Sequence, residues 1–106
     1  MKYIVVLTTT STKKEGEKIS ALLLKNRLAS CVQIIGPIKS KYWWKGKIEK
    51  ASEWLCIIKS KLELYERLEK IIEENHSYEL PEIIAIPIEK GSKKYLRWID
   101  EELKIR

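Results

Sequence analysis

The strand-like segments of this chain are apolar at consecutive positions. Residues 3–9 read Tyr-Ile-Val-Val-Leu-Thr-Thr, and residues 54–58 read Trp-Leu-Cys-Ile-Ile. Successive side chains of a β-strand point to opposite faces of the sheet. An antiparallel sheet with one solvated face therefore alternates apolar and polar residues, and these segments do not. Both faces of the predicted sheet have to be covered.

Apolar periodicity and turn residues predict strands and helices in alternation along the chain. The strands are expected at residues 3–9, 30–38 (resuming through 42–44), 47–59 and 83–88, and the helices at residues 13–27, 61–75 and 93–104. The two-residue turn Lys45-Gly46 joins the second and third strands into a long hairpin. This turn places Trp44 opposite Lys47, Gly36 opposite Leu55 and Cys56 opposite Ile35.

Proline positions refine the prediction for two strands. Because proline cannot donate a hydrogen bond to a neighbouring strand, Gly36-Pro37 is expected to bend or bulge the second strand, and Pro87 places the last strand at an edge. The order βαββαβ with two right-handed crossovers then gives an antiparallel sheet of strand order 4-1-3-2, with both main helices on one face. This is an α+β, ferredoxin-like fold, expected as a single domain over residues 1–106.

The second face of this sheet needs a cover. A final helix of about 12 residues could lie on it, but it covers too little of a four-stranded sheet. We therefore favour a closed ring in which copies of the chain pack sheet against sheet and protect the long edge hairpin.

Composition restricts the class of protein. The 106 residues include 21 basic and 15 acidic ones, for a net charge of +6. Enrichment in lysine and glutamate with few amides is typical of heat-adapted proteins. No apolar run is long enough to span a membrane, and the N-terminal run is too short for a signal-peptide core, so a cytoplasmic location is expected. Two cysteines cannot form a disulfide framework.

Two segments could carry chemistry. Residues 39–47 interleave lysines with Tyr42, Trp43 and Trp44, which suits either single-stranded nucleic acid or subunit contact. We favour subunit contact, because the central strands lack the aromatic pattern of RNA-binding sheets, and we expect no nucleic-acid partner.

Residues 76–82 group an imidazole, a phenol and two carboxylates. His76, Glu79 and Glu82 could bind a divalent cation through a mixed nitrogen and oxygen set, or the loop could simply pack through Tyr78 and Pro81. A neighbouring copy could complete such a site. Replacing His76 by alanine is then expected to leave folding intact. Motifs for nucleophilic catalysis or a P-loop are absent from the sequence, so no enzymatic activity is expected.

Four segments together resemble the CutA family of divalent-cation tolerance proteins. They are Ala29-Ser30-Cys31-Val32, Tyr42-Trp43-Trp44-Lys45-Gly46-Lys47-Ile48-Glu49, His76-Ser77-Tyr78-Glu79-Leu80-Pro81-Glu82-Ile83-Ile84-Ala85 and Tyr95-Leu96-Arg97-Trp98-Ile99. The resemblance implies a stable ferredoxin-like homotrimer, linked to tolerance of copper and other divalent ions, with no established enzymatic activity. From the lack of a long apolar run, no direct membrane insertion is expected.

The resemblance also implies a site at the junction between subunits. It places Cys31, Tyr42, Trp44, Glu53, Lys59, His76, Tyr78 and Glu82 in the cleft that the family forms there. Where proposed copper ligands of the family are a cysteine and two histidines, this chain has Thr8, Asn75 and His76. Only His76 is retained, so the resemblance implies weak binding of Cu²⁺ or another divalent cation by His76 with carboxylates. A sensor of the PII type, binding a small anion or nucleotide, and a purely structural scaffold stay open as alternatives.

Overall fold

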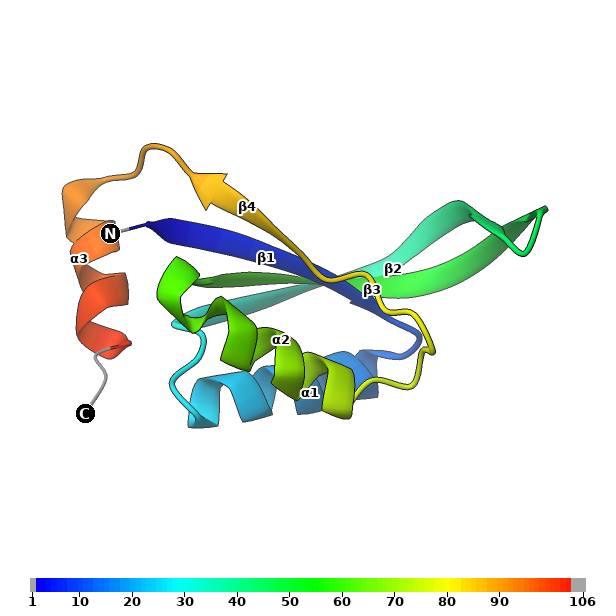
Figure 1. Cartoon of the computed structure of the whole chain (residues 1–106), viewed down its shortest axis with the longest axis horizontal. Coiled ribbons are helices and arrows are strands. Elements are labelled where there is room, and N and C mark those ends of the chain that lie inside the picture. Colours follow the sequence, from blue (N-terminus) through cyan, green and yellow to red (C-terminus); the bar gives the residue numbers. More distant parts are fainter. Residues whose placement is uncertain (1, 104–106) are drawn as a thin grey trace.

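The computed structural model describes residues 2–103, which form four strands, three α-helices and one short 3₁₀ turn (Figure 1). The elements are β1 (Tyr3–Thr10), α1 (Lys13–Lys25), β2 (Cys31–Trp44), β3 (Lys47–Lys61), η1 (Leu62–Leu64), α2 (Tyr65–Glu74), β4 (Ile84–Ile88) and α3 (Lys93–Glu102). No helix in this part of the chain is long and apolar enough to cross a membrane.

The sheet has the order β2-β3-β1-β4 with every neighbouring pair antiparallel. The predicted α+β fold and strand order are confirmed, and Pro87 lies in the edge strand β4 as expected. Helices α1 and α2 cover one face of the sheet, and the β2–β3 hairpin extends well beyond them (Figure 1).

The hairpin contains the predicted irregularity. Trp44 pairs with Lys47 and Ile38 with Glu53, but the register then shifts, so that Ile35 pairs with Leu55. The predicted pairs Gly36–Leu55 and Ile35–Cys56 are wrong by one residue, because Gly36 and Pro37 together stand opposite a single residue of β3. At the other end, Lys45 and Gly46 both have positive φ, +50° and +79°, as the expected tight turn requires.

The ends of other helices and strands differ by a few residues from their predicted positions. α1 stops at Lys25, two residues early, because Arg27 adopts a left-handed conformation with φ of +55°. The predicted helix over residues 61–75 begins with the 3₁₀ turn η1. Strands β1 and β3 extend to Thr10 and Lys61. The predicted end of the last helix at residue 104 lies outside the described residues.

The hydrophobic core lies between the sheet and its two helices. Alternate residues of the central strands point into it, including Val6 of β1 and Ile58 of β3, which are paired with each other. Ile19 of α1 and Leu68 of α2 pack into the core from the helix side and are fully buried.

The opposite side of the sheet, called here the open face, is only partly covered. By the pairing register it carries Tyr3, Val5, Leu7, Cys31, Gln33, Ile35, Leu55, Ile57, Lys59, Ile84, Ile86 and Ile88. Ile35, Ile84 and Ile86 remain 50%, 47% and 46% exposed. In the described chain, then, the final helix leaves these residues of the open face uncovered.

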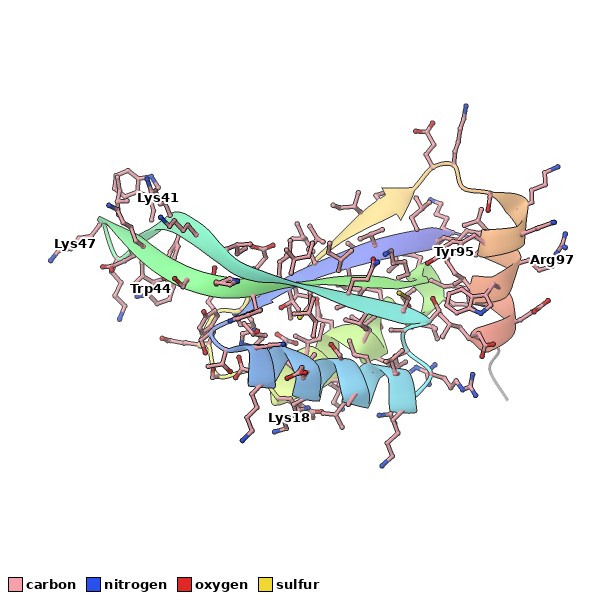
Figure 2. All side chains as sticks on the ribbon, turned by 180° about the vertical axis from the view of Figure 1, so that it is seen from behind. Lys18, Lys41, Trp44, Lys47, Tyr95 and Arg97 are labelled. Carbon is pink, nitrogen blue, oxygen red and sulfur yellow. The ribbon has the colours of Figure 1, made fainter. Side chains whose placement is uncertain are left out.

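Helix α3 packs instead at the end of the sheet where β1 begins (Figures 1 and 2). The Tyr3 hydroxyl and the Lys61 ammonium both donate hydrogen bonds to the Asp100 carboxylate on α3. The hydrogen bond from Tyr3, with that from Lys61, holds the pKa of Asp100 below its usual value. Ile99 and Leu103 are buried beside these contacts. This polar cluster fixes where α3 docks.

The bulge depends on glycine at position 36. A Cβ atom there would lie 2.5 Å from Cε3 of Trp54, well inside contact distance. We expect Gly36→Ala to lower the free energy of unfolding by about 1–2 kcal/mol, because the Trp54 ring has to move. Urea denaturation measures this, with Lys39→Ala on the same strand as an exposed control. Equal denaturation midpoints for the two variants would contradict the expectation.

Candidate functional site: a cleft between the hairpin and the loop after α2

An open cleft of about 840 Å³ separates the outer half of the β2–β3 hairpin from the loop of residues 76–82. The hairpin contributes Tyr42, Trp44 and Glu53 to its lining, together with Lys39 and Lys41. In Figure 1 the loop, drawn in yellow, runs below the hairpin, and Figure 2 shows Lys41, Trp44 and Lys47 on the hairpin's outer part. The loop contributes Tyr78, Glu79 and Glu82.

His76 anchors the loop to the end of β1. Its side chain is 0% exposed. Nε2 lies 2.8 Å from the carbonyl oxygen of Thr9 and donates to it, while Nδ1 accepts a hydrogen bond of 3.1 Å from the backbone N–H of Tyr78. These two partners fix the proton on Nε2. Both ring nitrogens are therefore engaged within the chain.

Glu15 of α1 holds the next residue of the loop. The Ser77 backbone N–H and hydroxyl donate to the two carboxylate oxygens of Glu15, at 3.2 and 3.1 Å. The N–H of Glu15 itself donates to Oγ1 of Thr12, the residue that caps α1. The loop is thus tied to the first turn of a helix that is fixed in the core.

Tyr78 reaches from the loop to the hairpin. Its hydroxyl donates a hydrogen bond of 2.7 Å to Oε2 of Glu53. Burial, followed by this contact with the Glu53 carboxylate, raises the pKa of the Tyr78 hydroxyl well above its usual value, so it stays protonated as a donor. Glu53 is only 6% exposed. The base of the cleft is therefore a buried carboxylate capped by a phenol.

The structure brings together most of the residues expected at the cleft, but not all of them. Tyr42, Trp44, Glu53, Tyr78 and Glu82 line it. Cys31 and Lys59 pair with each other at the far end of the hairpin, where the Lys59 ammonium contacts the Gln33 side chain. Within one chain these two residues are not part of the cleft.

The expected metal-binding set is incomplete in a single chain. Glu79 and Glu82 are exposed at the cleft, but His76 has no free ring nitrogen. Across residues 2–103, no three His, Cys, Asp or Glu side chains are grouped to hold a metal ion. The donor set of the single chain therefore does not fit a closed metal site.

Thr8 and Asn75 stand at the two positions where the family resemblance implies copper ligands that this chain lacks. The structure shows what surrounds each of them. Thr8 is 0% exposed on the helix-covered face, and its hydroxyl oxygen has no hydrogen-bond partner among the described residues. The Asn75 side chain donates to the carbonyl oxygen of Ile71 and closes the end of α2. Neither residue lines the cleft.

Comparison with models of known protein families shows which family this chain belongs to. The family model described as CutA1 divalent ion tolerance protein matches residues 4–102. The chain belongs to the CutA1 family. The predicted resemblance is thereby confirmed.

Relatives of this CutA1-family chain come from distant organisms. It is 43% identical over 99 residues to the divalent-cation tolerance protein CutA of Archaeoglobus fulgidus, covering 93% of this chain and 96% of that one. It is 41% identical over 96 residues to the chloroplastic protein CutA 1 of Oryza sativa subsp. japonica, covering 91% of this chain. That alignment covers 54% of the rice protein, so the chain spans about half the length of its plant relatives.

Solved structures agree with the CutA1 assignment. The periplasmic divalent cation tolerance protein CutA from Archaeoglobus fulgidus matches with a TM-score of 0.93 at 42% identity, covering 96% of this chain and 99% of that chain. CutA1 from Oryza sativa matches with a TM-score of 0.94 at 38% identity, covering 98% and 95%.

Sequence reasoning missed two contributors to the site. Glu15 stands three residues after Thr12, a spacing typical of a helix N-terminus. That spacing gives no indication that the Glu15 carboxylate also binds Ser77. The carbonyl of Thr9 has no side-chain signal at all. Its contact with His76 depends on the loop's path across the end of β1.

Proposed function

We propose that this CutA1-family chain acts in tolerance of divalent cations as a homotrimer that binds ions weakly at the clefts between subunits. The observation that carries the proposal is the open face, an apolar sheet surface left largely uncovered by the chain's own helices. Packing of such faces around a closed ring buries them in every copy.

The edges of the sheet support the same arrangement. β2 and β4 are the outer strands, and β2 continues into the projecting hairpin with its exposed Trp43. Long edge strands that carry apolar side chains need a partner strand or a cover. A neighbouring copy would supply one.

Metal binding at the cleft would depend on more than one chain. Glu79 and Glu82 would supply carboxylate oxygens from the loop, and His76 would act as a ligand only by giving up one of its two hydrogen bonds. Such a set is consistent with weak binding. The resemblance places Cys31 and Lys59 at the junction, and a neighbouring copy is the source that would bring them there.

The proposal also covers the type of activity and the cellular location of the protein. We propose a binding role without catalysis, in the cytoplasm. The two cysteines are free thiols, which suits a reducing compartment. The lysine- and glutamate-rich surface favours stability at high temperature.

A second candidate is a sensor that binds a small anion or nucleotide. It is favoured by Lys39 and Lys41, which line the cleft and form no ion pair within the described residues. Phosphate groups would find cations there.

Calorimetric titration with Cu²⁺, Zn²⁺ and ATP separates the candidates. We expect weak binding of the metal ions, and we expect the double variant Glu79→Gln, Glu82→Gln to weaken it by about tenfold or more because carboxylate ligands are lost. The matched control replaces Glu89 and Glu101, two exposed glutamates away from the cleft, by glutamine. Equal metal affinity in both double variants, or binding of ATP alone, would contradict metal binding at this cleft.

A further inference from the structure

Helix α3 is held to the sheet by few apolar contacts, and it stands apart from the layer that α1 and α2 form (Figure 1). Of its ten residues, Ile99 alone is buried, and Leu103, which caps its C-terminal end, is buried beside it. Helix α2, which is equally long, buries both Leu68 and Ile72. Segments with few buried contacts are the first to open in a folded protein. The polar contacts of α3 therefore decide whether it stays docked.

A buried ammonium lies against α3. The Lys61 side chain is 5% exposed, and its Nζ lies 3.3 Å from Oδ1 of Asp100 and 3.3 Å from Oε1 of Glu63. The Glu63 side chain is 46% exposed, so water screens its charge. The Asp100 side chain is 31% exposed and belongs to α3. Helix α3 thus brings the less exposed of the two counter-ions of Lys61.

The Asp100 carboxylate is held from two strands at once. Tyr3 of β1 donates to Oδ2 and Lys61 of β3 donates to Oδ1, and these two donors are partners across the strands. The hydrogen bond to Asp100 also raises the pKa of Tyr3, so its hydroxyl stays a donor. Among the described residues, the other ion pair of α3 joins Glu102 to Arg27, where both side chains are exposed. Exposed pairs of this kind add little.

Docking of α3 therefore depends on pH. The hydrogen bond from Tyr3, with that from Lys61, lowers the pKa of Asp100 from its ordinary value of 3.8. Such a group stabilises the docked state above its ordinary pKa, and the contribution is lost as the pH falls through the lowered value. Neutral Asp100 leaves the Lys61 ammonium buried with only the half-exposed Glu63 as a partner, which is unfavourable. Detachment of α3 relieves this, because water then reaches the ammonium.

We propose that α3 is an acid-released strap, in which protonation of the Asp100 carboxylate detaches the helix from the end of the sheet while the helix-covered core stays folded. The release uncovers Ile99, Leu103 and the ends of β1 and β3. The inference concerns contacts within one chain, so it is independent of the proposed trimer and of cation binding at the cleft.

Protection of backbone amides against hydrogen exchange in the intact protein tests the proposal. Protection factors compare each amide with an unstructured chain at the same pH, so the pH dependence of the exchange chemistry cancels. Between about pH 7 and about pH 3 we expect the protection of α3 to fall about tenfold or more, while α1 and α2 keep theirs. Unchanged protection of α3 in acid, or an equal loss in all three helices, would overturn the proposal.

The variant Asp100→Asn removes the charge at neutral pH. Asparagine keeps the size of the side chain and still accepts the hydrogen bond from Tyr3, so a change reports on the lost charge. We expect the protection of α3 at about pH 7 to fall about tenfold or more. Glu101→Gln, an exposed change at the next position of the same helix, is the matched control and should leave protection unchanged. Equal protection of α3 in the two variants would show that Asp100 does not hold the strap.

Lys61→Met separates the proposed release from a general loss of stability in acid. Methionine is a flexible, uncharged side chain that fills the buried position without needing a counter-ion. In this variant we expect α3 to stay protected in acid, and in the double variant Lys61→Met, Asp100→Asn we expect its protection at neutral pH to return close to that of the unmodified protein. If the double variant protects α3 no better than Asp100→Asn does, the buried ammonium does not drive the release and the proposal is wrong.

Discussion

Leu7→Asp is expected to yield a folded monomer in place of the proposed trimer. Leu7 lies on the central strand β1, between Ile57 and Ile84 on the neighbouring strands, and its side chain points to the open face. The helix-covered core is therefore untouched by the change. An aspartate in every copy of a buried interface would cost several kcal/mol per carboxylate, which is enough to dissociate it. Sedimentation velocity should show a particle of 12.5 kDa.

The matched control is Lys18→Asp. Lys18 is exposed on the solvent side of α1, away from the sheet (Figure 2), and the same new carboxylate there should leave the particle mass unchanged. Circular dichroism confirms that both variants keep their secondary structure. If the unmodified protein itself sediments as a monomer at micromolar concentration, the trimer is excluded and the proposal of clefts between subunits is excluded with it.

His76→Ala is expected to lower the free energy of unfolding by about 2–4 kcal/mol. The sequence alone predicts that this change leaves folding intact and affects only metal binding. The structure changes that expectation. Removing the ring leaves the carbonyl of Thr9 and the N–H of Tyr78 without their partners and opens a cavity where the side chain was fully enclosed. Urea denaturation measures the loss.

Two further variants serve as controls for the stability loss expected in His76→Ala. His76→Gln keeps an amide that can donate to the carbonyl of Thr9, so it should recover part of the lost stability. Ser77→Ala removes a neighbouring hydroxyl whose contact with Glu15 is exposed, and it should cost less than about 1 kcal/mol. If His76→Ala unfolds at the same urea concentration as the unmodified protein, the ring does not hold the loop.

Topology could be predicted from the sequence because it follows from patterns that do not depend on side-chain detail. The run Ile4-Val5-Val6-Leu7 identified β1 as central, Pro87 identified β4 as an edge, and right-handed crossovers then left one strand order. The register of the hairpin could not be predicted in full. Gly36-Pro37 signalled an irregularity, but whether it bends the strand or inserts a residue depends on packing against Trp54.

The site was predictable only for residues whose chemistry shows in the sequence. Aromatic and carboxylate residues such as Trp44 and Glu53 could be placed at the cleft through the family resemblance. The role of His76 could not be predicted, because its partners are a carbonyl at position 9 and an N–H at position 78. Backbone groups have the same chemistry at every position, so no sequence pattern marks them.

The irregularity at Gly36 and Pro37 also decides which side chains of the outer hairpin share a face. Before it, odd-numbered residues of β2 share a face with Leu55 and Ile57, and after it the even-numbered residues share a face with Glu53. The extra residue thus reverses the parity of the strand. With a regular ladder, Tyr42 and Trp44 would face away from Glu53 and Lys41 and Trp43 would take their place, so a single inserted amino acid determines which side chains the carboxylate meets.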